Sequence, residues 1–148
     1  MQISSRFTMG VHILTCIEVF KDDHQLNSEF IASSVGANPV IIRKIFGQMK
    51  TAGLISVKRG GNGGVELARP VDEISLYDIY SAVESVEDEG LFHFHENPNA
   101  NCEVGRNMHK SMDKRLNQIQ AAMENEMKGM KLSDVIEDTK KEILLESK

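Results

Sequence analysis

The chain has 148 residues, close to the size of one domain, and its 41% hydrophobic and 26% charged residues are typical of a globular protein. This composition excludes wholesale disorder and a collagen-like chain, and two cysteines are too few for a disulfide scaffold. No apolar run is longer than three residues, whereas a membrane-spanning helix needs about 20, so we expect no membrane segment and a cytoplasmic location.

The charged residues are distributed unevenly along the chain. The formal net charge is −5, yet residues 1–69 carry a net charge of +3 and residues 70–148 a net charge of −8. Residues 38–69 alone carry a net charge of +5. We therefore expect a basic unit over residues 1–70, suited to a polyanion, and an acidic unit over 71–148, although solvated surface charge would give the same counts.

Three short helices are predicted before residue 53. Apolar residues recur every three or four positions over residues 5–20, which is typical of an amphipathic helix. Asn27 is a suitable N-cap for a second helix that ends at Gly36. Asn38 followed by Pro39 predicts the start of a third helix that ends near residue 52.

The apolar positions of this third helix form one stripe. Ile42, Ile45 and Met49 are three or four residues apart, which places them on a single face. Arg43 and Lys44 lie largely outside that stripe, so we expect them at the surface.

A hairpin is predicted after the third helix. Residues 54–58 and 65–67 have strand character and are joined by a glycine-rich turn over 59–64. Three helices followed by a hairpin is the order of a winged helix-turn-helix, in which the third helix enters the major groove of DNA and the hairpin contacts the flanking backbone. We therefore expect a mostly α fold with a small β-hairpin wing (α+β).

The acidic unit begins with a well-marked helix start. Ser75 and Asp78 have the spacing of a capping box, which predicts a helix from Ser75 to Val86. Residues 87–101 have no periodicity and are predicted as a loop. A final helix is expected from Ser133 to Leu145.

A long helix is predicted between that loop and the final helix. Over residues 102–128 apolar side chains step by three or four for about 37 Å. This length exceeds what a small core needs, so we expect a dimerisation helix whose stripe packs against a second copy of the chain. The alternative is that the stripe covers the basic unit of its own chain. The expected dimer interface comprises Met108, Met112, Leu116, Ile119 and Met123.

The sequence resembles the Rrf-two (Rrf2) family of bacterial transcription regulators. The resemblance covers nearly the whole chain, and its most specific part is the hairpin region, which reads Ala52-Gly53-Leu54-Ile55, Lys58-Arg59-Gly60-Gly61-Asn62-Gly63-Gly64 and Leu67-Ala68-Arg69. It implies a cytoplasmic, homodimeric and usually repressing protein that binds double-stranded DNA and dimerises through its long helix. Val57, Val65 and Ile41 depart from the residues common in the family.

The winged-helix arrangement predicts which residues contact DNA. Ser5, Arg6 and Lys58 are expected to bind phosphates, and Arg43 to read a guanine at the groove. Arg59 is expected to insert at the wing, where neighbouring glycines remove side-chain bulk. The remaining expected contacts are Asn38, Pro39, Val40, Lys44, Gly60, Gly61, Asn62 and Gly63.

The cysteines suggest a thiol sensor rather than a cofactor site. Relatives such as the iron-sulfur cluster regulator hold a cluster with three cysteines before the long helix, whereas this region contains Cys102 alone. We therefore expect no iron-sulfur cluster and no other cofactor. Cys102 lies at the start of the long helix, where the helix dipole lowers a thiol pKa, so it is a candidate redox sensor, with an incidental cysteine as the alternative. Cys16, on an apolar helix, is expected to be buried and inert.

Metal binding and catalysis are not expected. His93, His95, Cys102 and His109 could supply metal ligands, but their spacing matches no standard zinc motif. The glycine-rich turn lacks the Lys-Ser/Thr of a P-loop and leads into a strand. No residues form a set of nucleophile, base and orienting group, so we do not expect an enzyme.

The sequence therefore predicts a dimeric, sequence-specific DNA-binding transcriptional regulator, a repressor that responds to a redox signal or a ligand. The alternative is a winged-helix protein-interaction module, in which the methionine-rich helix and the acidic C-terminal segment bind a partner protein.

Overall fold

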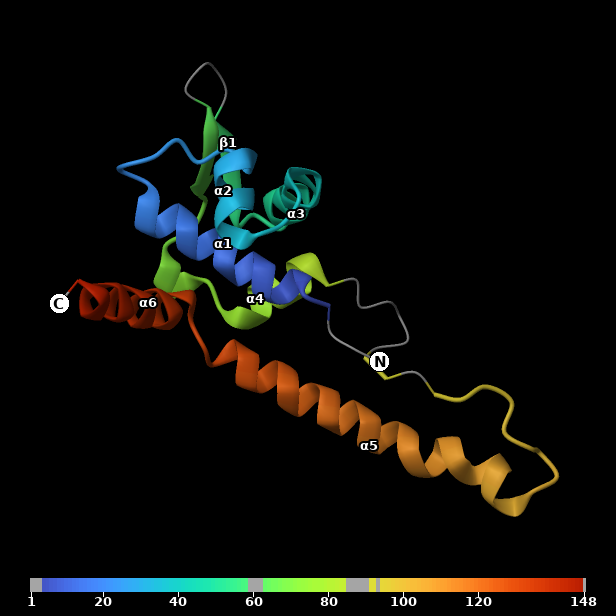
Figure 1. The fold of residues 1–148 in the computed structure, drawn as a ribbon. Helices are drawn as coiled ribbons and strands as arrows, with labels where there is room; N and C mark the ends of the chain where they lie inside the picture. The colour runs from blue at the N-terminus through green and yellow to red at the C-terminus, as the bar shows by residue number, and fades with distance from the viewer. Residues whose placement is uncertain (1–3, 59–62, 85–90, 93, 148) are drawn as a thin grey trace.

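The computed structural model describes residues 4–58, 63–84, 91–92 and 94–147 and contains the predicted mostly helical fold with one small hairpin (Figure 1). The helices are α1 (Arg6–Phe20), α2 (Ser28–Val35), α3 (Pro39–Thr51), α4 (Leu76–Val83), α5 (Glu103–Lys128) and α6 (Leu132–Glu146). The strands are β1 (Ile55–Lys58) and β2 (Gly64–Leu67), and a 3-10 turn, η1 (Val71–Glu73), precedes α4.

Local capping positions the second and third helices. The side chain of Asn27 accepts a hydrogen bond of 2.8 Å from the backbone N–H of Phe30, and α2 ends at Gly36, whose φ of 78° lies in the left-handed region. The side chain of Asn38 accepts a 2.8 Å hydrogen bond from Val40 N–H, with Pro39 at the first helical position. Both predicted helix starts are confirmed.

The hairpin is tied to the segment before α2. β1 and β2 pair antiparallel, with Ser56 opposite Glu66 and Lys58 opposite Gly64. Val65 N–H donates a 3.0 Å hydrogen bond to the carbonyl of Leu26. A Cβ atom at Gly64 would lie only 2.9 Å from that carbonyl oxygen, so this close approach requires glycine.

One hydrophobic core joins the winged-helix elements to α4 and α6. α4 packs on α1 at Gly10, where a Cβ atom would lie 3.0 Å from the side chain of Ile79. Leu132 and Ile136 of α6 belong to the same buried cluster as the underside of α3. The core therefore continues across residue 70.

The end of α4 and the start of α6 differ from the prediction. The predicted end at Val86 is wrong: α4 ends at Val83, because Glu84 is already extended and its carboxylate accepts a 2.7 Å hydrogen bond from Ser4 Oγ. α6 begins at Leu132 rather than Ser133, because the carboxylate of Asp134 accepts a hydrogen bond from Lys131 N–H.

Two backbone hydrogen bonds determine where α5 ends and α6 begins. Leu76 N–H donates to the carbonyl of Met130 at 2.9 Å, and Leu132 N–H donates to the carbonyl of Ile74 at 2.8 Å. Figure 1 shows α5 beginning far from the compact part of the molecule and ending beside it, where α6 starts and packs against it. No residue over 103–128 is fully buried, which leaves α5 outside the core. Within the described ranges, none of the helices is both long enough and apolar enough to cross a bilayer.

Candidate nucleic-acid interface

The packing of α3 determines which of its side chains face outward. Ile42, Ile45 and Met49 are fully buried beneath the helix. The opposite side therefore exposes Val40 and Lys44. This face combines positive charge with apolar side chains, and α3 itself lies beside the hairpin (Figure 1).

Arg43, the residue expected to read guanine, contacts α2 in this structure. Its guanidinium donates a 3.2 Å hydrogen bond to Ser28 Oγ and lies 3.6 Å from the carboxylate of Glu29. The charged side chains of Arg43 and Glu29 are both largely exposed, so the ion pair is weak and Arg43 easily exchanges it for another anion. The contact places the Arg43 guanidinium near the N-terminus of α2, where the helix dipole favours the Glu29 carboxylate but not a cation.

The wing presents Lys58 at the described end of β1. Lys58 Nζ lies 3.6 Å from the carboxylate of Glu66 on β2, and both side chains are exposed. The carbonyl of Gly63 accepts a 2.9 Å hydrogen bond from the side chain of Gln25. The expected contacts at Arg59, Gly60, Gly61 and Asn62 lie outside the described residues.

The remaining expected contacts fall at two helix starts. Asn38 and Pro39 begin α3 beside Val40, as predicted. Ser5 and Arg6 begin α1, which spans about 22 Å, at the end away from the segment that contacts the hairpin. The structure therefore brings Asn38, Pro39, Val40 and Lys44 together on one surface and places Ser5 and Arg6 on another part of the molecule.

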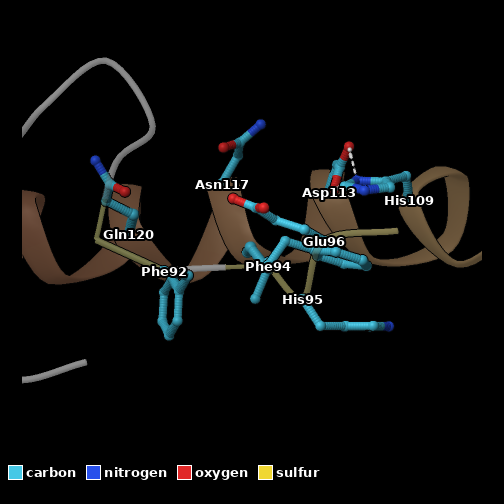
Figure 2. A pocket seen from close by; sticks show the side chains of 9 residues that line it. Phe92, Phe94, His95, Glu96, His109, Asp113, Asn117 and Gln120 are labelled. Atoms are coloured by element: carbon cyan, nitrogen blue, oxygen red, sulfur yellow. Dashed lines mark hydrogen bonds and ion pairs between the residues drawn. The ribbon is translucent and has the colours of Figure 1, made fainter. Parts of the chain in front are cut away.

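A hollow lies where the predicted loop packs on α5. Phe94 stacks on His109 with ring centroids 3.8 Å apart and on His95 with centroids 4.6 Å apart. Figure 2 shows the contact between His109 and Asp113, which are separated by 3.1 Å. The hollow has a volume of about 400 Å³ and is also lined by Phe92, Glu96, Leu116, Asn117 and Gln120. Sequence reasoning missed this aromatic stack, although the alternation of Phe and His over residues 92–95 was a usable signal.

The two cysteines have opposite environments. Cys102 is exposed at the N-terminus of α5, where interaction with the backbone N–H groups of Gly105 and then Val104 lowers its pKa. Cys16 is buried on α1, and loss of hydration raises its pKa despite a contact with Ser34 Oγ at 3.3 Å. His12 also contacts Ser34, at 2.9 Å, so the three side chains meet, but the raised pKa keeps Cys16 a thiol rather than a nucleophilic thiolate.

Comparison with known proteins gives consistent results. The family model named Rrf2, described as an iron-dependent transcriptional regulator, matches residues 3–138. The chain is 38% identical over 134 residues to the "Putative HTH-type transcriptional regulator YwnA" of Bacillus subtilis (strain 168), covering 90% of this chain and 96% of that protein.

Solved structures share the fold. A crystal structure described as "a putative DNA binding protein" is 31% identical, with a TM-score of 0.69, and the match covers 89% of this chain and 99% of that one. CymR (YrzC), the global cysteine regulator of B. subtilis, is 18% identical, with a TM-score of 0.66 over 93% of this chain and 97% of that one.

The thiols of this chain do not fit an iron-sulfur cluster. Such a cluster is held by three or four cysteine or histidine ligands, whereas Cys16 is in the core on α1 and Cys102 is at the surface on α5. Over the described parts of the chain, no three His, Cys, Asp or Glu side chains gather in a metal-binding arrangement, and His93 lies outside those parts.

We predict that the two thiols react with iodoacetamide over different pH ranges. Because the thiolate is the reactive form and the pKa of Cys102 is lowered, Cys16→Ala, which retains Cys102, should be alkylated with a midpoint below the value for an ordinary cysteine. Cys102→Ser, which retains Cys16, should react slowly and with a midpoint above that value. Mass spectrometry of each variant against pH measures both midpoints, and a shared midpoint would contradict the assigned environments.

Proposed function

The chain belongs to the Rrf2 family, and we propose that it is a homodimeric, sequence-specific DNA-binding transcriptional regulator that acts as a cytoplasmic repressor. The observation that carries this proposal is the outward face of α3, which presents exposed Val40 and Lys44 beside the hairpin while its opposite face fills the core. A helix held in this way is suited to the major groove of DNA.

Each element has a distinct role in the proposed complex. α3 lies in the major groove, with Arg43 reading a guanine after exchanging its contact with Glu29 for the base. Lys58, Ser5 and Arg6 bind phosphates, and Arg59 enters the neighbouring minor groove at the wing. Phosphate contacts set the register of the protein on DNA, and base contacts give the sequence preference.

The proposed homodimer is built on α5. Its 26 residues extend for about 39 Å, and its apolar stripe is only partly covered by the chain itself. Ile119 is 54% exposed, and Met108, Met112, Leu116 and Met123 are half-buried. Pairing two stripes would shield this apolar surface and present two copies of α3 to one pseudo-palindromic operator, with half-sites one or two helical turns apart.

Cys102 is the proposed redox-sensitive group. Its lowered pKa and its exposure favour attack of the thiolate on hydrogen peroxide, which breaks the O–O bond, forms a sulfenic acid and releases hydroxide. The regulator is proposed to work without an iron-sulfur cluster, in line with the separation of its two thiols.

A protein-interaction module is the second candidate function. The end of α6 exposes Ile143, Leu144 and Leu145, and such surfaces favour contact with a protein. An electrophoretic titration separates the two candidates: specific retention of one duplex that weakens steeply with salt supports the regulator, and indifference to all duplexes supports the interaction module.

Arg43→Ala should weaken binding to the operator by about 1 to 3 kcal/mol and leave binding to mismatched duplexes nearly unchanged, because a base contact is lost. Titrations against matched and mismatched duplexes at one salt concentration measure both values. An equal loss on every duplex would instead assign Arg43 to a phosphate.

Ile119→Glu should convert the dimer to a monomer, because it places a charge in the centre of the apolar stripe. Size-exclusion chromatography with light scattering gives the mass directly. Lys114→Glu is the control, since Lys114 is exposed on the other side of α5. A dimer that survives Ile119→Glu would place the interface elsewhere.

Cys102→Ser should abolish release from DNA after treatment with hydrogen peroxide, whereas the wild-type protein and Cys16→Ala should both be released. Fluorescence anisotropy of a labelled operator follows the release. Unchanged release of Cys102→Ser would exclude Cys102 from the response.

A further inference from the structure

The outward face of α3 contains a glycine, Gly47, that no contact among the described residues explains. Val40, Lys44 and Gly47 are spaced by four and then three residues, which aligns them on the side opposite the buried Ile42 and Met49. The line formed by Val40, Lys44 and Gly47 is called the outer stripe of α3 below. Along this stripe, Val40 has an apolar side chain, Lys44 has a cationic one and Gly47 has none.

Glycine at position 47 is unfavourable for the helix itself. Alanine is the better helix former in a helix interior, because glycine loses more conformational freedom on folding. Gly10 and Gly64 have internal reasons for their missing side chains, since a Cβ atom there would lie 3.0 Å from Ile79 and 2.9 Å from Leu26. At Gly47, no atom of the described residues outside the helix backbone lies within 4 Å of such a Cβ atom, and the backbone is helical. No contact within the described residues therefore requires glycine at position 47.

The exposed apolar side chains near Gly47 indicate which chemical group would contact the outer stripe of α3. Val40 is 62% exposed and Ile41 is 41% exposed, on a helix whose other outward residues include Arg43 and Lys44. In the major groove, the apolar group that a base pair presents is the C5-methyl of thymine. Val40 and Gly47 are about 10 Å apart along the helix axis, which corresponds to about three base steps.

We propose that Gly47 is a specificity-determining residue, whose missing side chain lets the outer stripe of α3 approach the base edges closely enough for Val40 to contact a thymine methyl group. This inference rests on the proposed DNA-binding function and names one feature of the operator, a thymine in each half-site. A methyl group at position 47 would hold the middle of α3 away from the bases and separate Val40 from its contact.

Gly47→Ala tests the close approach with a duplex that the wild-type protein selects from a random pool. The variant should be more stable, with a melting temperature about 2 to 4 °C higher, because alanine favours the helix. Its affinity for the selected duplex should fall by about tenfold or more. Its affinity for a scrambled duplex should stay within about twofold, since non-specific binding depends on phosphate contacts.

Gly129→Ala is the matched control. Gly129 follows α5, has a φ of −82°, and a Cβ atom there would lie 3.5 Å from its nearest neighbour, an ordinary contact. This variant should match or exceed the wild-type melting temperature and retain the wild-type affinity for both duplexes.

The thymine contact is tested by replacing each thymine of the selected duplex with uracil, which removes only the methyl group. At one or more positions in each half-site, wild-type affinity should fall by about fourfold, as expected for one buried methyl group. Val40→Ala should bind the selected duplex more weakly and lose this sensitivity to uracil.

The outcomes distinguish a failure of the proposed DNA-binding function from a failure of the role proposed for Gly47. If the wild-type protein selects no duplex, the proposed function fails and this inference fails with it. If the wild-type protein selects a duplex but Gly47→Ala binds it equally well, or Gly47→Ala lowers the melting temperature, only the role of Gly47 is overturned. If no thymine is sensitive to uracil, the contact with Val40 is overturned.

Discussion

Burial of one face of α3 is the constraint on which the rest of the structure depends. Ile42, Ile45 and Met49 are fully buried, and each such side chain contributes about 1.5 to 3 kcal/mol relative to exposure. Rotation of α3 about its axis would expose all three, so the helix has one stable orientation. The outward position of Val40, Lys44 and Gly47 follows directly, and the proposed DNA surface is therefore a consequence of the core.

A second constraint places α5 outside that core. The pairing of residues 74–76 with residues 130–132 fixes the start of α6, whose Leu132 and Ile136 are buried. α6 thus packs on the compact part of the molecule, while α5 projects from it with an apolar stripe that its own chain covers only in part. A partly exposed apolar stripe of this length is the physical basis for the proposed pairing of two chains.

Features encoded by neighbouring residues were predictable from the sequence, and features that depend on distant residues were not. The starts of α2, α3 and α4 follow from Asn27, Asn38 and the Ser75–Asp78 capping box, because a cap acts within three residues. The end of α4 has no comparable local signal: Glu84 is already extended and accepts a hydrogen bond from Ser4, 80 residues away, so the predicted end at Val86 was wrong. The contact of Arg43 with Glu29 and the open space around Gly47 likewise depend on how helices pack.

The central claim is that two copies of the chain, joined along α5, bind one duplex with two copies of α3. The most direct measurement is the mass of the complex with a selected duplex, by analytical ultracentrifugation at low ionic strength. The account predicts two chains per duplex and a dimer of the same size without DNA. A monomer that binds alone, or a protein that forms no complex with any duplex, would contradict it.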